Sequence, residues 1–224
     1  MEKVFTLRNA DKFAQYESYW HSITPQTDAQ IFQRWLFAFS SIHTTWESNM
    51  NLYNSIKNFE EWINNSELLM QRLIEGRAGL HNQRYINILN FSKKFWANPD
   101  AFKKSSKESY VELRNRLAKD LTGIGLAKTS FALELCYPNT VEVVCLDVHM
   151  LRLLNLNEQG YRANIPKEIR AYELGEKVWL NKSQSLLVSP YITRCLWWDL
   201  NQGHQNSRYW SHCFEDQLCF DFCG

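Results

Sequence analysis

The sequence predicts an all-α fold, and three observations support this. Of the 224 residues, 45% are hydrophobic, which is enough to build a full core. Only 8 glycines and 5 prolines are present, which disfavours a loop-rich β protein. Apolar residues recur at helical spacing through most of the chain, whereas the β-branched run 141–145 is a weak strand signal that an extended connector explains equally well. We expect one globular unit, 1–224.

The helices are placed by apolar spacing and by capping residues. In 27–40, Ile31, Trp35 and Phe39 lie four residues apart and mark one buried face. Ser189 followed by Pro190 is typical of an N-cap and a first helical position. The other expected helices are 82–96, with a buried face of Tyr85, Ile88, Leu89 and Trp96, and segments that start at Ser66 and Lys167.

Charge and targeting signals narrow the class of protein. The formal net charge is only +1, so the strongly basic character of nonspecific nucleic-acid binders is absent. The N-terminus lacks the apolar run of a signal peptide, and no stretch approaches the roughly 18 continuous apolar residues of a membrane span. We expect a cytoplasmic protein, not associated with membranes, whose six cysteines are mostly reduced.

A glycine turn joins two predicted helices, 113–121 and 126–136. Gly123 and Gly125 flank Ile124, and glycines at this spacing allow positive φ and close approach of the backbone. With Ile124 buried between the helices, the first amides of the second helix face outward and form a site for phosphate. A plain αα-corner is the alternative interpretation.

A second feature follows 22 residues after this turn. Asp147 lies where the apolar run 141–146 changes into a helix, which predicts an N-cap. A carboxylate with apolar neighbours is also partly desolvated, which makes Asp147 a candidate for chemistry. His149, two residues later, is expected to point elsewhere and to act as a hydrogen-bonding partner.

Together these motifs resemble the helix-hairpin-helix DNA glycosylases, a superfamily that includes endonuclease III, the adenine glycosylase and the 8-oxoguanine glycosylases. The family hairpin L-P-G-x-G is similar to 121–125, and its D-x-H-x-x-R motif is matched by 147–152. The segment 39–45 is similar to the family's L-S-x-Q-x-T-D, and 79–84 to its G-L-Y-N-x-K turn. The motifs keep their order and spacing across roughly residues 30–200.

The resemblance implies a two-lobed glycosylase-like fold and a role for each matching residue. Asp147 would be the catalytic carboxylate, which stabilises the developing sugar cation or activates the nucleophile. Leu80 matches the wedge that enters the duplex beside a flipped nucleotide, and Ile42 or His43 falls at the base pocket. The residues implied to contact DNA are Leu80, His81, Asn82, Gly123, Ile124, Gly125, Ala127 and Lys128. The expected partner is double-stranded DNA with a flipped base.

The nucleophile position departs from the family pattern. Members that also cleave the DNA backbone carry a lysine two residues after the second hairpin glycine, and this position is Ala127. Water is therefore the expected nucleophile. Lys128, one residue later, serves instead only if the turn holds an extra residue; otherwise it contacts phosphate or faces solvent.

The C-terminal cysteines depart as well. Cys213 and Cys219 resemble the last two ligands of an endonuclease III-type iron–sulfur cluster, but Trp210 occupies the preceding ligand position. Alternative ligands for a cluster or zinc are Cys195, Cys223, His204 and His212. Buried packing of cysteines and aromatic residues is the favoured interpretation, so neither a metal nor a cofactor is expected.

The sequence thus predicts a monomeric DNA glycosylase, monofunctional with water as nucleophile. Lobe A is expected over 28–140, ending in the hairpin motif 113–136, and lobe B over 1–27 plus 141–224. Two alternatives are a phage-type transferase that acts on pyrophosphorylated 5-hydroxymethyl-thymine in DNA, and a noncatalytic DNA-binding module. Candidates for phosphate contacts or base stacking, each more typical of surface or core, are Lys103, Lys104, Lys107, Lys119, Trp197, Trp198 and Trp210.

Overall fold

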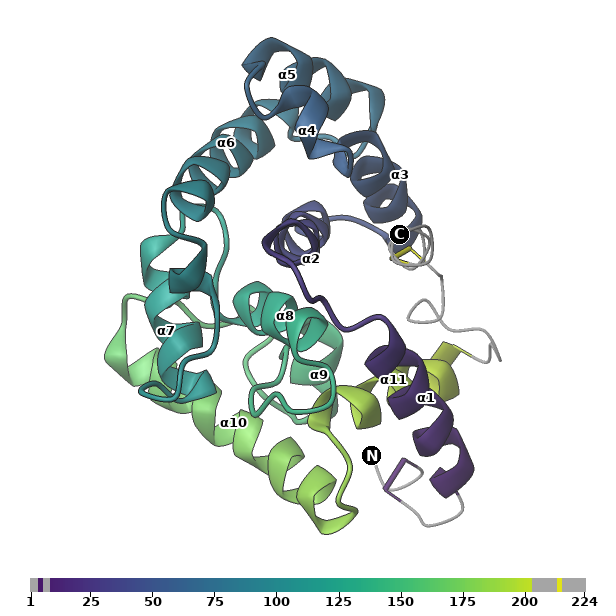
Figure 1. Cartoon of the computed structure of the whole chain (residues 1–224). Coiled ribbons are helices and arrows are strands. Elements are labelled where there is room, and N and C mark those ends of the chain that lie inside the picture. Colours follow the sequence, from purple (N-terminus) through teal and green to yellow (C-terminus); the bar gives the residue numbers. More distant parts are fainter. Residues whose placement is uncertain (1–3, 6–8, 203–212, 215–224) are drawn as a thin grey trace.

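The computed structural model describes residues 4–5, 9–202 and 213–214, and all regular structure in these residues is helical (Figure 1). The predicted all-α fold is therefore confirmed. The elements are α1 (Ala10–Ser22), α2 (Asp28–Ser40), α3 (Trp46–Ile56), α4 (Phe59–Trp62), α5 (Ser66–Glu75), α6 (His81–Ala97), the 3-10 turn η2 (Pro99–Phe102), α7 (Tyr110–Asp120), α8 (Leu126–Cys136), α9 (Val148–Leu153), α10 (Pro166–Ser185) and α11 (Pro190–Gln202). Among the described helices, none has the length and apolar character needed to span a bilayer.

Polar side chains define where several helices begin. Thr27 and Gln30 form a capping box at the start of α2, as do Ser109 and Glu112 at the start of α7. The second box explains why α7 begins at Tyr110, three residues before the predicted start. Pro190 opens α11 as expected, with the Ser189 hydroxyl accepting from the Tyr191 amide (3.3 Å).

Helix α2 lies at the centre of the ribbon arrangement and packs against α3, α6 and α8 (Figure 1). It is buried on almost every side because apolar residues surround its axis. Phe32 stacks on Phe91 of α6 with ring centroids 5.1 Å apart, and Phe37 packs edge-on against Tyr53 of α3 at 5.2 Å. Large aromatic side chains thus hold the first half of the chain together.

The buried face of α6 differs from the predicted one. Ile88 is buried as expected, but Trp96 is 38% exposed, and the buried positions include the polar residues Arg84 and Asn87. Arg84 is satisfied by four backbone carbonyls, so its burial depends on hydrogen bonds that apolar spacing does not reveal.

The C-terminal helices meet the N-terminal helix. Helix α1 packs against α11, which also contacts α10 (Figure 1). Trp197 and Trp198 are buried there, so both belong to the core. Phe214 packs near Trp20, with 6.5 Å between ring centroids. The boundaries of the two lobes stay a prediction. The predicted candidates Trp210, Cys219, Cys223, His204 and His212 lie outside the described residues.

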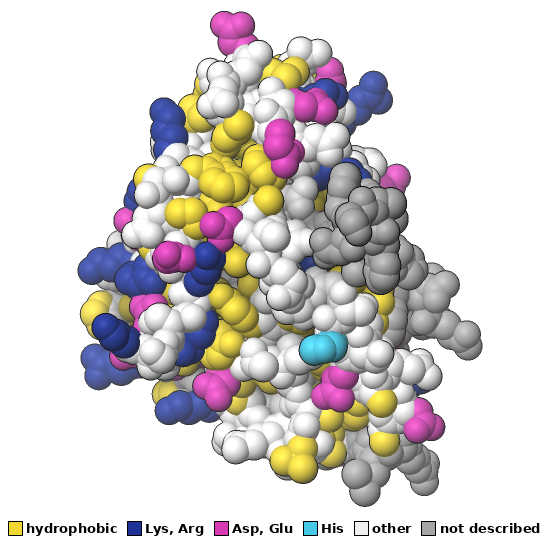
Figure 2. Space-filling model, viewed as in Figure 1, with side chains coloured by type: hydrophobic (Ala, Val, Ile, Leu, Met, Phe, Trp, Pro, Cys, Tyr) yellow, Lys and Arg dark blue, Asp and Glu magenta, His cyan; other side chains and the backbone are white. Residues whose placement is uncertain are grey.

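Several charged side chains on the surface form ion pairs. Figure 2 shows Lys and Arg side chains gathered along the side of α6 and α7, with acidic side chains between them. Lys103 contacts the carboxylates of Asp28 (2.7 Å) and Asp100 (2.8 Å), and these bonds raise its pKa to about 12. Lys94 pairs with Asp120 at 2.7 Å. Lys103, a predicted phosphate contact, already has carboxylate partners within the chain.

One carboxyl group between α1 and α11 predicts how stability changes with pH. Asp199 of α11 is only 7% exposed, and burial raises its pKa from 3.8 to about 7, with Lys12 acting in the opposite direction. Below pH 3.8 the Asp199 carboxyl is protonated in both the folded and the unfolded protein. As pH rises above 3.8, the carboxyl loses its proton first in the unfolded chain. The contribution of Asp199 to the free energy of unfolding is therefore lost as pH rises to about 7. The slope reaches at most about 1.4 kcal/mol per pH unit.

We expect Asp199→Asn to flatten the pH dependence of the free energy of unfolding over this range, measured by urea denaturation. Equal slopes for the variant and the parent protein would contradict the assignment.

Candidate active site and nucleic-acid interface

An extended connector, 141–146, joins α8 to α9 and carries Asp147 at its end. In a sheet, a neighbouring strand would accept hydrogen bonds from such buried amides. Here the amides of residues 144–146 donate to side chains instead. The Val144 amide donates to a carboxylate oxygen of Glu176 (2.6 Å), and the Cys145 amide to Glu134 (3.0 Å). The Leu146 amide donates to the hydroxyl of Tyr172 at 3.0 Å. The path of the connector is therefore fixed by α8 and α10.

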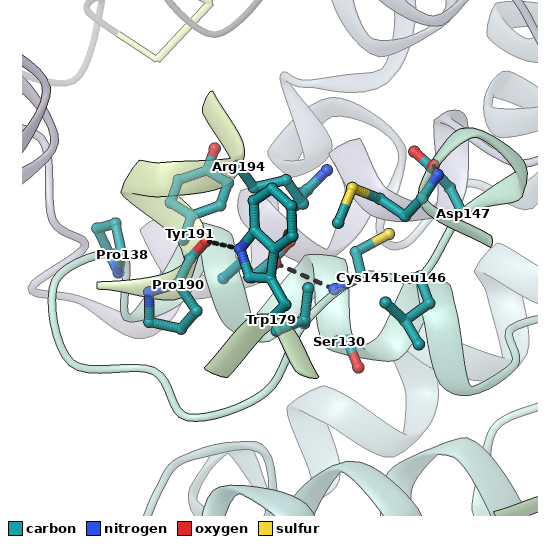
Figure 3. Close-up of polar contacts among 12 residues, drawn as sticks. Ser130, Pro138, Cys145, Leu146, Asp147, Trp179, Pro190, Tyr191 and Arg194 are labelled. Carbon is teal, nitrogen blue, oxygen red and sulfur yellow. Dashed lines mark hydrogen bonds and ion pairs between the residues drawn. The ribbon is translucent and has the colours of Figure 1, made fainter. Parts of the chain in front are cut away.

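Each of the two buried carboxylates has an arginine partner. Glu134 is bound by Arg194 of α11, whose Nε lies 3.0 Å from Oε1, and both side chains are buried. Glu176 lies 3.0 Å from Nη1 of Arg114 on α7. Burial raises the pKa of Glu176 to about 7 and Arg114 opposes that rise. Figure 3 shows Arg194 beside the connector residues that lead to Asp147.

Asp147 caps helix α9, as predicted from the sequence. Its Oδ1 accepts hydrogen bonds from the amides of His149 (3.1 Å) and Met150 (3.0 Å). His149 is exposed and turns its ring edge-on to Trp198, with centroids 4.8 Å apart. The cap holds the Asp147 side chain in one orientation at the mouth of a pocket.

This pocket, called here the Lys128–Asp147 pocket, forms where α3, α8, α11 and the connector meet. Lys128 and Phe131, three residues apart on α8, share the face that lines it, and the Lys128 Nζ lies 5.4 Å from the Phe131 ring centroid. Cys145 and Asp147, two residues apart along the chain, both reach it from the connector. The complete lining is Ser41, Thr44, Thr45, Trp46, Asn49, Lys128, Phe131, Cys145, Asp147 and Arg194.

Of the residues that the sequence analysis considered for the chemistry, some line this pocket and others do not. Lys128 and Asp147 line the same space, whereas Ala127 is not part of the lining. The Cys145 thiol is buried, and burial raises its pKa to about 12, so it stays protonated at neutral pH. Asn49, Phe131 and Arg194 were not anticipated, because only the packing of distant helices places them here.

The two hairpin glycines have different conformations. Gly123 has φ of 80°, and a Cβ there would lie 1.8 Å from Nδ2 of Asn87, so both backbone and packing require glycine. Gly125 has φ of −109° and open space around its Cβ position. Of the two glycines, only Gly123 uses the positive φ that glycine allows. Ile124 is buried as expected, which leaves only its backbone for a ligand.

A second pocket, called here the Leu80 pocket, lies next to the hairpin. Its lining includes Leu80, Gly123, Ile42 and His43, so the two residues assigned to the base pocket lie with the predicted wedge and outside the Lys128–Asp147 pocket. Leu80 is 58% exposed with φ of 53°, at the start of α6. His81 and Asn82 follow it and are exposed.

Arg84 fixes the turn that carries Leu80. Its guanidinium donates to the carbonyls of Gly79 (3.0 Å), Phe39 (3.2 Å) and Ile42 (2.6 Å). Because the C-terminal end of a helix carries partial negative charge, a cation at the end of α2 is favourable. The buried arginine thus binds the turn 79–80 to the loop after α2.

The described residues contain no group of three or more His, Cys, Asp or Glu side chains arranged to hold a metal ion.

Comparison with solved structures identifies the fold. The 8-oxoguanine DNA glycosylase of Methanocaldococcus jannaschii matches 91% of this chain and 94% of its own at a TM-score of 0.71 and 20% identity. That of Thermotoga maritima matches 88% and 93% at 0.69 and 20% identity. The M. jannaschii glycosylase/lyase with 15mer DNA containing 8-oxoguanine matches 87% and 91% at 0.67 and 20% identity. The chain therefore has the all-α fold of these solved structures. No family model and no curated protein matches the sequence.

The ion pair behind the connector gives a stability prediction. We expect Glu134→Gln to reduce the free energy of unfolding by about 3–5 kcal/mol, because the substitution removes the carboxylate that pairs with the buried Arg194. The double variant Glu134→Gln with Arg194→Met should recover most of this loss. Urea unfolding of both variants provides the measurement, and an additive double variant would show that the two side chains do not interact.

The hairpin glycines provide a matched pair of substitutions. Gly123→Ala should lower stability by more than about 1 kcal/mol, because alanine is strained at φ of 80° and its Cβ meets Asn87. Gly125→Ala, with no atom near its Cβ, is the control and should not lower stability. Thermal unfolding checks both, and similar losses would contradict the geometry described.

Proposed function

We propose that this protein is a DNA glycosylase that cleaves the N-glycosidic bond of a damaged, mismatched or modified base. The observation that carries the proposal is the Lys128–Asp147 pocket, in which an amine and a carboxylate line the same space. The shared fold adds support, because two of the structural neighbours are 8-oxoguanine DNA glycosylases and a third is one bound to DNA with that base.

The substrate would be a base flipped out of double-stranded DNA. The glycosidic carbon cannot be reached inside a stacked duplex, so a pocket below the surface requires flipping. Leu80, exposed on a firmly held turn, is suited to fill the vacated space. Backbone amides near Gly123 and Gly125, together with His81 and Asn82, would bind phosphates, and a monomer provides all of these groups.

Asp147 and the nucleophile would divide the chemistry. As the bond to the base breaks, positive charge develops on the sugar, and the Asp147 carboxylate stabilises it. The base leaves with the bonding electron pair and takes up a proton.

Ala127 at the family's lysine position favours water as the nucleophile, but the pocket supports Lys128. In that reaction the neutral Lys128 amine attacks C1′ and gives up a proton. The C1′–O4′ bond then breaks, O4′ keeps the electron pair and takes up a proton, and a Schiff base links Lys128 to C1′.

Borohydride trapping distinguishes the two nucleophiles. With duplexes that each carry one modified base, including 8-oxoguanine, we expect the parent protein to form a trapped covalent adduct and Lys128→Gln to form none. Lys177→Gln, a lysine in a separate pocket that residues 140–142 help to line, is the matched control and should be trapped normally. Asp147→Asn should slow single-turnover release of the base by about 100-fold or more.

The products also test the alternatives. Release of free base without trapping would show that water attacks, as Ala127 suggests. A heavier base retained in the DNA, detected by mass spectrometry, would support a transferase. DNA binding without any change to the base would support a noncatalytic module and overturn the proposal.

A further inference from the structure

Asn49 is a buried amide in the Lys128–Asp147 pocket that has no role in the chemistry proposed above. It lies on α3, one turn after Trp46, and both residues line the pocket. Its side chain is 3% exposed, and its Oδ1 has no hydrogen-bond donor among the described residues. A carbonyl buried in this way weakens the folded protein.

Asn87 shows how the same fold treats another buried asparagine. Asn87 lies in the Leu80 pocket, and its Oδ1 accepts a hydrogen bond from Gln83 at 3.0 Å. For Oδ1 of Asn49, which lines the other pocket, the described residues supply no such partner. An unpaired buried carbonyl oxygen in a pocket that Lys128 and Asp147 also line is most readily explained by a bound molecule that donates a hydrogen bond to it.

The neighbours of Asn49 indicate the shape of that molecule. Two aromatic side chains, Trp46 from α3 and Phe131 from α8, line the same pocket. Trp46 is held edge-on by Phe37, with centroids 5.6 Å apart. Aromatic faces favour a planar ring, and stacking on them does not distinguish one base from another. Discrimination must therefore come from a polar group, and Asn49 is suited to that role.

We propose that Asn49 reads the hydrogen-bonding edge of the flipped base. A carboxamide presents an acceptor beside donors, so its complement is a base edge with an N–H group next to a carbonyl or ring nitrogen. The substrates of this pocket are accordingly bases with such an edge, and a base without it is rejected because the amide stays unpaired. This inference rests on the proposed function, because it requires a flipped base in the pocket.

Equilibrium binding tests the inference separately from catalysis. The probes are duplexes that carry 8-oxoguanine, hypoxanthine or uracil on a 2′-fluoro sugar, which resists cleavage, and a duplex with a tetrahydrofuran abasic analogue. The ratio of affinities for base and abasic duplexes measures recognition of the base. We expect the parent protein to prefer at least one base duplex, and Asn49→Leu to reduce that preference by about 10-fold or more.

Two further measurements separate reading of the base from a structural role. Affinity of Asn49→Leu for the abasic duplex should be unchanged, and its midpoint of thermal unfolding should hold or rise, because an unpaired buried amide is removed. Asn139→Leu is the matched control: Asn139 Oδ1 is also buried and unpartnered among the described residues, but it lines a different pocket. This control should keep the preference for the base.

The outcomes for the inference and for the proposed function differ. A parent protein that prefers no base duplex, or an Asn49→Leu variant that keeps the preference or unfolds at lower temperature, overturns the role of Asn49. If base preference depends on Asn49 but cleavable duplexes release no base, the inference stands and the glycosylase proposal fails. If base is released while Asn49→Leu keeps the preference, the reverse holds.

Discussion

The site depends on one constraint, which is that an extended segment crosses the interior without a neighbouring strand. The amides of 144–146 are buried, and unpaired buried amides would be costly. Glu134, Tyr172 and Glu176 satisfy them, and the hydroxyl of Tyr172 also donates to the Val144 carbonyl at 2.6 Å. The position of Asp147 is thus set by side chains from two helices on which the connector lies.

The side chains that bind the connector include two carboxylates, which bring buried charge into the core and require partners from further helices. A buried carboxylate needs a counter-charge, which Arg194 provides from α11 and Arg114 from α7. Four helices are therefore bound to the connector through two ion pairs. Arg194 also lines the Lys128–Asp147 pocket, so the same ion pair that stabilises the connector forms part of the pocket wall. Stability and site geometry have a common origin.

Local features could be predicted from the sequence, and features that depend on distant contacts could not. Helix α8 has the predicted bounds, and Asp147 caps α9, because spacing and capping are properties of neighbouring residues. Glu134 and Arg194 are 60 positions apart, so no local pattern connects them. The sequence did not decide which way Lys128 faces, because this depends on the residue at which α8 begins. The helix begins at Leu126, which places Lys128 on the same face as Phe131.

The loop after α2 connects the two pockets of the site. Ile42 and His43 line the Leu80 pocket, whereas Thr44 and Thr45 line the Lys128–Asp147 pocket. Arg84 binds the Ile42 carbonyl and the turn that carries Leu80, so the exposed leucine and this loop are joined by one buried guanidinium. Arg84 therefore bridges the turn that carries Leu80 and the loop that leads into α3. One loop thus lines both pockets, and one buried guanidinium holds that loop to the exposed turn.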